Sequence, residues 1–203
     1  MIIAIARQYG SGGRKIGQKV AKDLNLPFYD KELIALAAQE SGISKELFEK
    51  ADEKASNSLL YSLIMGSYTF GNHVDPAIEM PINDKLFIIQ SDIITKAAQE
   101  GPCVIVGRCA DYVLRECKNV FNVFIYADKF ARMDRIVEEY GINPEKAAAD
   151  VVKKDKQRAN YYNFYTNKKW GDLENYHLAI DSSAVGIDNA SELIKAAAEM
   201  MAP

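Results

Sequence analysis

The sequence predicts an α/β protein in which helices cover both faces of a central parallel sheet. Continuous apolar runs over 2–6, 103–107 and 120–126 suit strands that are buried on both faces. Segments with apolar residues at helical spacing separate these runs along the whole chain. Strands that alternate with helices in this way pair in parallel through right-handed crossovers, which gives three layers.

The individual elements follow the same alternation. The expected strands are 2–6, 26–30, 103–107, 120–126 and 177–181. The expected helices are 14–24, 32–41, 44–59, 83–101, 110–116, 129–140, 143–165 and 189–201. Residues 66–82 hold glycines, prolines and aromatics without steady periodicity, which predicts a long connection. With 203 residues, the chain suits one domain with a lid or insertion, or at most two small domains.

A glycine-rich turn joins the first strand to the first helix. Its glycines let backbone N–H groups converge on an anion, and the start of the helix adds unpaired donors and a positive dipole end. Arg14 and Lys15 place two cations where the dipole disfavours them, which favours an anion among them. The alternative is a plain strand-to-helix turn. The phosphate-binding interpretation assigns Gly10, Ser11, Gly12, Gly13, Arg14 and Lys15 to the site.

The turn departs from the phosphate loop G-x-x-x-x-G-K-[ST]. Gly13 stands where the lysine is expected, and no serine or threonine follows it. In such loops the lysine reaches the β- and γ-phosphates and the hydroxyl holds magnesium. Arg14 or Lys15 can supply the positive charge, but neither can ligate a metal. The metal ligands therefore stay open.

Composition narrows the class of protein. A hydrophobic content of 48% and a charged content of 26% are ordinary for a folded soluble protein, and the net charge of −3 argues against a general nucleic-acid binder. No apolar run reaches the length of a membrane span, and Arg7 interrupts the apolar start before a signal-peptide pattern can form. Three cysteines lack metal-ligand or C-x-x-C spacing. We expect a cytoplasmic protein with reduced thiols.

Several predicted strands end in a residue suited to ligand binding. Asp30 ends the second strand, Gly107-Arg108 the third, Asp128 follows the fourth and Asp181 ends the last. Ligands of parallel sheets bind at the carboxyl ends of the strands. These residues predict a site at that edge.

The motifs resemble the nucleoside monophosphate kinases of the P-loop superfamily, above all cytidylate kinase and its cytidylate kinase-like relatives. Residues 7–14 are similar to the opening of the cytidylate kinase-like group. Gly107-Arg108 resembles a G-R-D segment whose arginine contacts the acceptor, with Cys109 in place of the aspartate. Asp155 and Arg158 resemble a D-x-x-R motif on the lid side, and 178–182 resembles the terminal strand with its L-D-[ST] end.

The resemblance implies a three-layer α/β/α P-loop NTPase fold in one domain, with a helical acceptor-binding segment at 31–82 and a basic lid at 143–176. It implies a kinase that uses ATP and Mg²⁺ to phosphorylate a nucleoside monophosphate-like acceptor. We expect Arg132 to join the loop in binding the donor, and Arg14, Lys15 and Arg158 to serve catalysis. The substrate-binding residues implied are Asp30, Arg108, Asp155 and Arg158. The alternative is a catalytically inactive nucleotide- or anion-binding module that acts as a sensor or partner-binding domain.

The expected lid interleaves basic and aromatic residues. One interpretation is a solvated basic helix face with aromatics packed inward. A second is a surface for single-stranded nucleic acid, which the acidic charge of the whole makes unlikely. A third is a cationic cover that stabilises a transferring phosphoryl group. The tract comprises Lys153, Lys154, Lys156, Arg158, Tyr161, Tyr162, Phe164, Tyr165, Lys168, Lys169 and Trp170.

Overall fold

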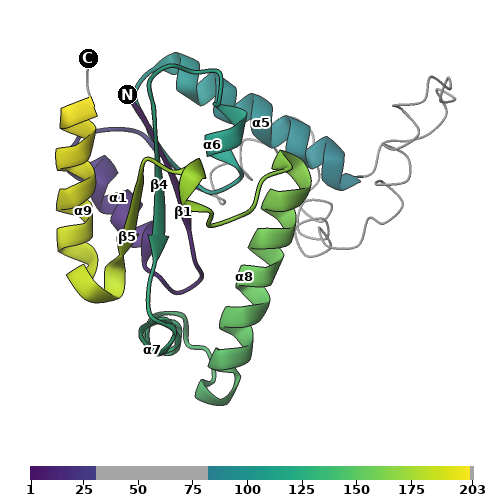
Figure 1. Cartoon of the computed structure of the whole chain (residues 1–203), viewed down its shortest axis with the longest axis vertical. Coiled ribbons are helices and arrows are strands. Elements are labelled where there is room, and N and C mark those ends of the chain that lie inside the picture. Colours follow the sequence, from purple (N-terminus) through teal and green to yellow (C-terminus); the bar gives the residue numbers. More distant parts are fainter. Residues whose placement is uncertain (31–81, 202–203) are drawn as a thin grey trace, which may run out of the picture.

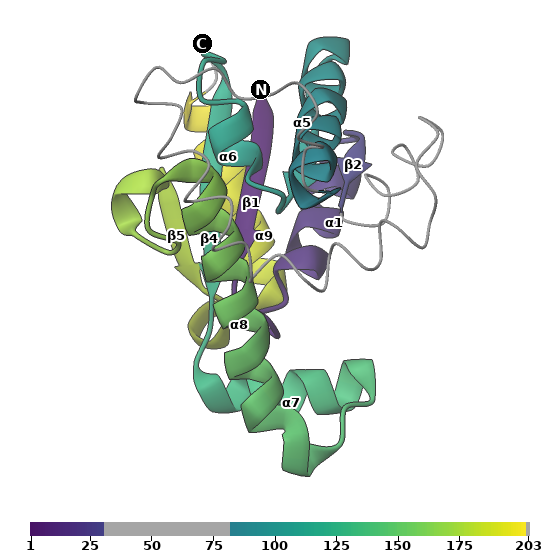
Figure 2. The same cartoon turned by 90° about the vertical axis from the view of Figure 1, so that its right-hand side faces the viewer.

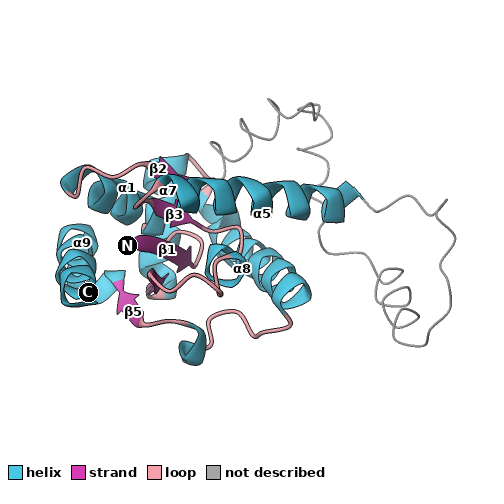
Figure 3. Cartoon of the chain, turned by 90° about the horizontal axis from the view of Figure 1, so that it is seen from above, coloured by secondary structure: helices cyan, strands magenta, loops and turns pink. Residues whose placement is uncertain are grey.

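A computed structural model describes residues 1–30 and 82–201 and contains a five-stranded parallel sheet. The strand order is β2-β3-β1-β4-β5, and every neighbouring pair is parallel. The expected α/β architecture is confirmed (Figure 3). The strands are β1 (Ile2–Arg7), β2 (Phe28–Tyr29), β3 (Val104–Val106), β4 (Val120–Tyr126) and β5 (Leu178–Asp181).

The helices agree with the sequence pattern over most of the described chain. They are α1 (Gly13–Asp23), α5 (Ile82–Glu100), α6 (Ala110–Val113), α7 (Lys129–Tyr140), α8 (Pro144–Thr166), a 3₁₀ turn η1 (Leu173–Asn175) and α9 (Ser182–Met201). The helices expected over 32–41 and 44–59, and the connection up to residue 81, lie outside the described residues.

Alternate side chains of β1 face opposite helical layers. Ile3 and Ile5 belong to a core shared with α1 and α9, whereas Ile2 and Ala4 belong to a core shared with α5 and α6. This alternation follows from the two-residue period of a strand. Figure 3 shows α1 and α9 on one side of the sheet and α5 on the other. Each large apolar side chain buried in this way contributes about 1.5–3 kcal/mol.

Helix α7 and the first part of α8 lie beyond the carboxyl ends of the strands. In Figure 1, β4 points towards α7, and in Figure 2 the two helices form a hairpin that projects from the sheet. Ile136 of α7 packs with Ala147 and Val151 of α8 in a separate small core, which Tyr9 covers. The hairpin is thereby attached to the end of β1.

Helix α9 begins seven residues before the expected start at Asn189. Its first turn follows β5 directly, because the Asp181 carboxylate accepts hydrogen bonds from the N–H groups of Ser183 and Ala184. Gly186 then breaks the helix with φ 80° and ψ 167°. A single turn before a break is too short to show helical periodicity, so the sequence pattern missed it.

Ser182 in this turn ties β4 and the glycine-rich loop together. Its buried hydroxyl lies 2.6 Å from the Ser11 carbonyl oxygen and 3.2 Å from that of Tyr126. We expect Ser182→Ala to lower the free energy of unfolding by about 1–3 kcal/mol, because it leaves a buried carbonyl without its donor. Urea denaturation followed by circular dichroism measures this change.

Ser183→Ala is the matched control. The neighbouring Ser183 hydroxyl bonds Asp181 and the Asp128 N–H at an exposed position, where water can replace it. We expect a loss of no more than about 0.5 kcal/mol. Equal losses in the two variants would contradict the role given to Ser182.

Candidate phosphate-binding site

The loop between β1 and α1 is held by its own hydrogen bonds. The Ser11 hydroxyl donates to the Gln8 carbonyl oxygen at 2.9 Å, and the Gln8 side chain accepts from the Ala127 N–H at 3.2 Å. The Ser11 side chain is therefore turned into the loop. Gly10 adopts φ 76°, and a Cβ there would lie 2.6 Å from the Arg132 carbonyl oxygen, so only glycine fits.

The start of α1 offers backbone donors. Its N-cap is Gly12, at φ 77°, and no side chain caps the helix. Within the described ranges, the N–H groups of Gly12, Gly13 and Lys15 donate no hydrogen bond. Such donors at a helix N-terminus form an anion-binding site.

The two cations that follow the loop are drawn to carboxylates. Arg14 Nε lies 2.7 Å from Asp30 Oδ2, and Lys15 Nζ lies 2.7 Å from Glu139 Oε1 on α7. Asp30 is buried at the end of β2, so Arg14 offsets the cost of its burial. The catalytic and phosphate-binding roles of Arg14 and Lys15, and the acceptor-binding role of Asp30, stay predictions.

Helix α8 turns its Asp155 and Arg158 towards the end of β1. Asp155 Oδ1 accepts from the Tyr9 N–H at 2.7 Å, and Oδ2 forms an ion pair with Arg132. Arg158 Nη1 donates to the Arg7 carbonyl oxygen at 2.9 Å, and its guanidinium lies 5.6 Å from the centre of the Tyr9 ring. The two residues share one helix face and contact one strand end.

Two arginines of α7 bind carbonyl groups of the loop. Arg135 Nη1 donates to the Gly10 carbonyl oxygen at 2.6 Å, and Arg132 Nη1 lies 3.4 Å from that of Tyr9. Arg132 is buried, and its Nη1 also donates to the Asp155 carboxylate. The geometry gives both residues a part in shaping the loop. The predicted contact of Arg132 with donor phosphates stays a prediction.

Arg108 lies at the end of β3 in a run of left-handed residues. Gly107, Arg108 and Cys109 have φ of 86°, 57° and 55°, which is costly for the two that carry a side chain. The Arg108 guanidinium lies 5.9 Å from the centre of the Tyr161 ring on α8. Backbone strain of this kind persists where the surroundings enforce it, and it is common at functional sites.

Arg7 enters the site although the sequence analysis did not select it. Burial lowers the pKa of its guanidinium well below the ordinary value, and the charges of Arg158 and Arg108 lower it further. Burial also lowers the pKa of Arg158, whereas the Asp155 charge raises it. Three guanidinium groups therefore lie close together at the ends of β1, β3 and the middle of α8. The sequence signal that could have selected Arg7 is its position in the phosphate-loop pattern, where it stands in place of the first glycine.

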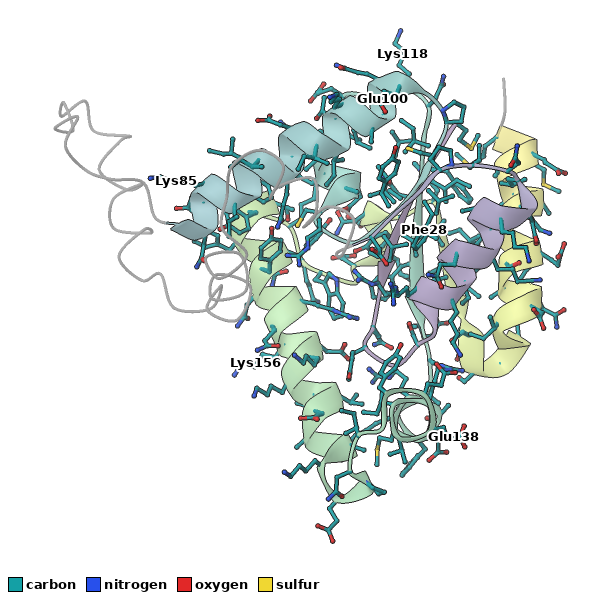
Figure 4. All side chains as sticks on the ribbon, turned by 180° about the vertical axis from the view of Figure 1, so that it is seen from behind. Phe28, Lys85, Glu100, Lys118, Glu138 and Lys156 are labelled. Carbon is teal, nitrogen blue, oxygen red and sulfur yellow. The ribbon has the colours of Figure 1, made fainter. Side chains whose placement is uncertain are left out.

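The tyrosines of α8 pack against α5 and α6. Their hydroxyls donate to side chains of those helices: Tyr161 to Gln90 at 3.1 Å, Tyr162 to Asp111 at 2.6 Å and Tyr165 to Asp84 at 2.9 Å. The lysines 153, 154 and 156 are exposed, and Figure 4 shows Lys156 pointing away from the sheet. This arrangement fits the interpretation of a solvated basic face with aromatics packed inward.

Neither a metal cluster nor a membrane helix is found in the part of the chain that the structure describes. No group of three or more histidine, cysteine or acidic side chains could hold a metal ion there. No described helix is long and apolar enough to span a membrane.

Comparison of sequences gives a family. The sequence model of the cytidylate kinase-like family matches residues 2–184. The cytidylate kinase of Pyrococcus horikoshii is 24% identical over 205 aligned residues, which cover 100% of this chain and 91% of the relative. The cytidylate kinase of Aeropyrum pernix is 24% identical over 187 residues, which cover 91% of each chain.

Comparison of structures gives the fold. An uncharacterized protein from Eubacterium ventriosum superposes with a TM-score of 0.72 at 30% identity, over 98% of both chains. The shikimate kinase of Bacteroides thetaiotaomicron superposes with a TM-score of 0.51 at 11% identity, again over 98% of both chains, and shows a shared fold. The predicted P-loop fold is confirmed. With a family match from residue 2 to residue 184, the chain belongs to the cytidylate kinase-like family.

Proposed function

We propose that the protein transfers the γ-phosphoryl group of ATP to a nucleoside monophosphate-like acceptor. The observation that carries the proposal is the uncapped start of α1, whose backbone donors at Gly12, Gly13 and Lys15 follow the end of β1, where Arg158 also binds. Membership of a kinase-like family supports the reaction class. The names of the relatives support a nucleotide acceptor.

In this proposal the loop from Gly10 to Lys15 binds the donor phosphates through its backbone. Glycines allow the chain to approach the phosphates closely, and the helix dipole favours their negative charge. Arg14 and Lys15 contribute positive potential, although each is also engaged by a carboxylate. The loop is preorganised by Ser11, so little ordering is needed when a ligand binds.

The acceptor side of the proposal rests on strand ends and on α8. Arg108 binds acceptor phosphate, and Arg158 reaches the phosphoryl group in transfer. Asp30 now pairs with Arg14, and Asp155 now pairs with Arg132. Each carboxylate can orient the acceptor only if a group of the acceptor replaces its arginine. Such exchanges couple acceptor binding to the position of the loop.

The described residues fit a triphosphate better than a bound metal. The loop lacks the hydroxyl that usually holds magnesium, and the buried carboxylate of Asp30 is paired with Arg14. Mg²⁺ keeps several waters and is commonly held by substrate phosphates. We therefore propose that Mg²⁺ arrives with ATP, where it neutralises phosphate charge.

A transfer screen tests the reaction. With Mg²⁺ and ATP labelled at the γ-position, we expect label to pass to a nucleoside monophosphate and to yield the diphosphate. The panel contains CMP, dCMP, UMP, AMP and GMP, with shikimate and gluconate as non-nucleotide acceptors, and thin-layer chromatography separates the products. Binding of ATP without transfer to any acceptor would instead favour an inactive binding module.

Arg158→Ala tests the role of α8 in the transfer. We expect turnover to fall about 100- to 1,000-fold while ATP affinity changes less than about tenfold, because the arginine acts mainly on the transferring group. Steady-state kinetics with the best acceptor and ATP titration measure the two quantities. Lys156→Ala, two residues away on the outward face, removes the same charge and is expected to leave turnover unchanged. Equal turnover in both variants would contradict the assignment.

A further inference from the structure

Two positions of the phosphate loop have exchanged their residue types. In the pattern G-x-x-x-x-G-K-[ST], the first glycine lies six residues before the lysine. With Gly12 as the last glycine, the first glycine position is residue 7 and the lysine position is residue 13. This chain has Arg7 and Gly13 at those positions. The cation and the glycine have changed places.

The side chain of Arg7 occupies the space that a side chain at position 13 would need. A Cβ built on Gly13 would lie 2.6 Å from the Arg7 Cβ and 2.9 Å from its Cγ. Both separations are too short for real carbon atoms, so a larger residue at position 13 requires the Arg7 side chain to leave. Arg7 therefore starts where the usual lysine starts.

The guanidinium of Arg7 then reaches the end of β3. A Cβ built on Gly107 would lie 2.0 Å from Arg7 Nη1 and 3.0 Å from its Cζ, so the guanidinium lies against the Gly107 backbone. Arg108 follows directly, and Arg158 donates to the carbonyl oxygen of Arg7 itself. The side chain thus runs from the start of α1 to the residues proposed to bind the acceptor.

Among residues 1–30 and 82–201, no carboxylate forms an ion pair with Arg7, although the nearby Asp30 charge raises the pKa of Arg7. Arg14 pairs with Asp30, Lys15 with Glu139 and Arg132 with Asp155. Burial and the neighbouring arginines both lower the pKa of Arg7, so its charged form is stabilised less than in water. A bound oxyanion would offset this cost, and the planar guanidinium can bind phosphate through two hydrogen bonds.

We propose that Arg7 is the phosphate-binding cation of the loop: its side chain, reaching from β1 past Gly13 to Gly107, binds the triphosphate in place of the missing lysine. The proposal rests on the proposed function for the nature of the ligand and assigns the binding to a residue outside the usual lysine position. It also explains Gly13, which is small because Arg7 passes over it.

Isothermal titration of the full chain with ATP and with inorganic tripolyphosphate tests the assignment. We expect Arg7→Ala to weaken both about 10- to 100-fold, as the loss of charge-assisted hydrogen bonds predicts. The Arg14→Ala/Lys15→Ala double variant is expected to weaken them less than Arg7→Ala. Arg115→Ala is the control for loss of one positive charge, since Arg115 contacts only Tyr112 and Glu116 among the described residues. It is expected to bind as the parent does.

An exchange of the two residues keeps the test independent of folding defects. Gly13→Lys alone is expected to bind poorly, because the new side chain collides with Arg7. Arg7→Gly/Gly13→Lys rebuilds the usual loop and is expected to recover binding to within about tenfold of the parent. Circular dichroism and thermal unfolding confirm that each variant is folded.

The outcomes separate this proposal from the kinase reaction. Weak binding by Arg7→Ala, together with recovery in the exchange variant, supports the assignment of Arg7. If the parent binds ATP but transfers label to no acceptor, only the proposed reaction is refuted. Tripolyphosphate binding by Arg7→Ala within about twofold of the parent would overturn it. A parent that binds neither probe would overturn it as well.

Discussion

The buried ion pair between Asp155 and Arg132 is the contact on which the geometry of the site depends. Asp155 also accepts the Tyr9 N–H, and Arg132 also lies near the Tyr9 carbonyl oxygen, so both residues hold the same loop peptide. One carboxylate therefore fixes the loop, α7 and α8 relative to one another. Removing one partner from a buried pair is costly, because the other charge is left uncompensated. The pair contributes more to the shape of the site than to overall stability.

The other described carboxylates near the site pair with the two cations that follow the loop and form no ion pair with Arg7. Asp30 and Glu139 engage Arg14 and Lys15 at the rim of the loop. The charges of Arg158 and Arg108 lower the pKa of Arg7, so its charged form is less favourable beside them. A cluster of cations at the ends of the strands favours an anionic ligand.

Much of the fold could be predicted from the sequence because strand and helix periodicities are local. The apolar runs of β1, β3 and β4 and the cap and proline at the start of α8 specify their elements directly. The first turn of α9 escaped prediction because it depends on the Asp181 carboxylate and a break at Gly186.

The site was less predictable than the fold. Sequence spacing indicated the loop and the shared face of Asp155 and Arg158, but it could not show that Arg14 and Lys15 turn to carboxylates distant in the chain. The part of Arg7 depends on two close approaches, at Gly13 and at Gly107, which only the folded chain reveals. Ion pairs between residues distant in the chain decide which cations can bind a ligand, and local sequence patterns do not show these pairs.

The contacts of α8 have a mechanical consequence. Its 23 residues form a rod about 34 Å long. Asp155 and Arg158 attach the middle of the rod to the end of β1 and the loop, and the tyrosines 161, 162 and 165 attach its carboxyl-terminal part to α5 and α6. A helix cannot kink between two attached parts without losing backbone hydrogen bonds. Any closing movement must therefore turn the rod as a lever, so that displacement at the α5 end is transmitted to the contacts that its middle makes with the phosphate loop.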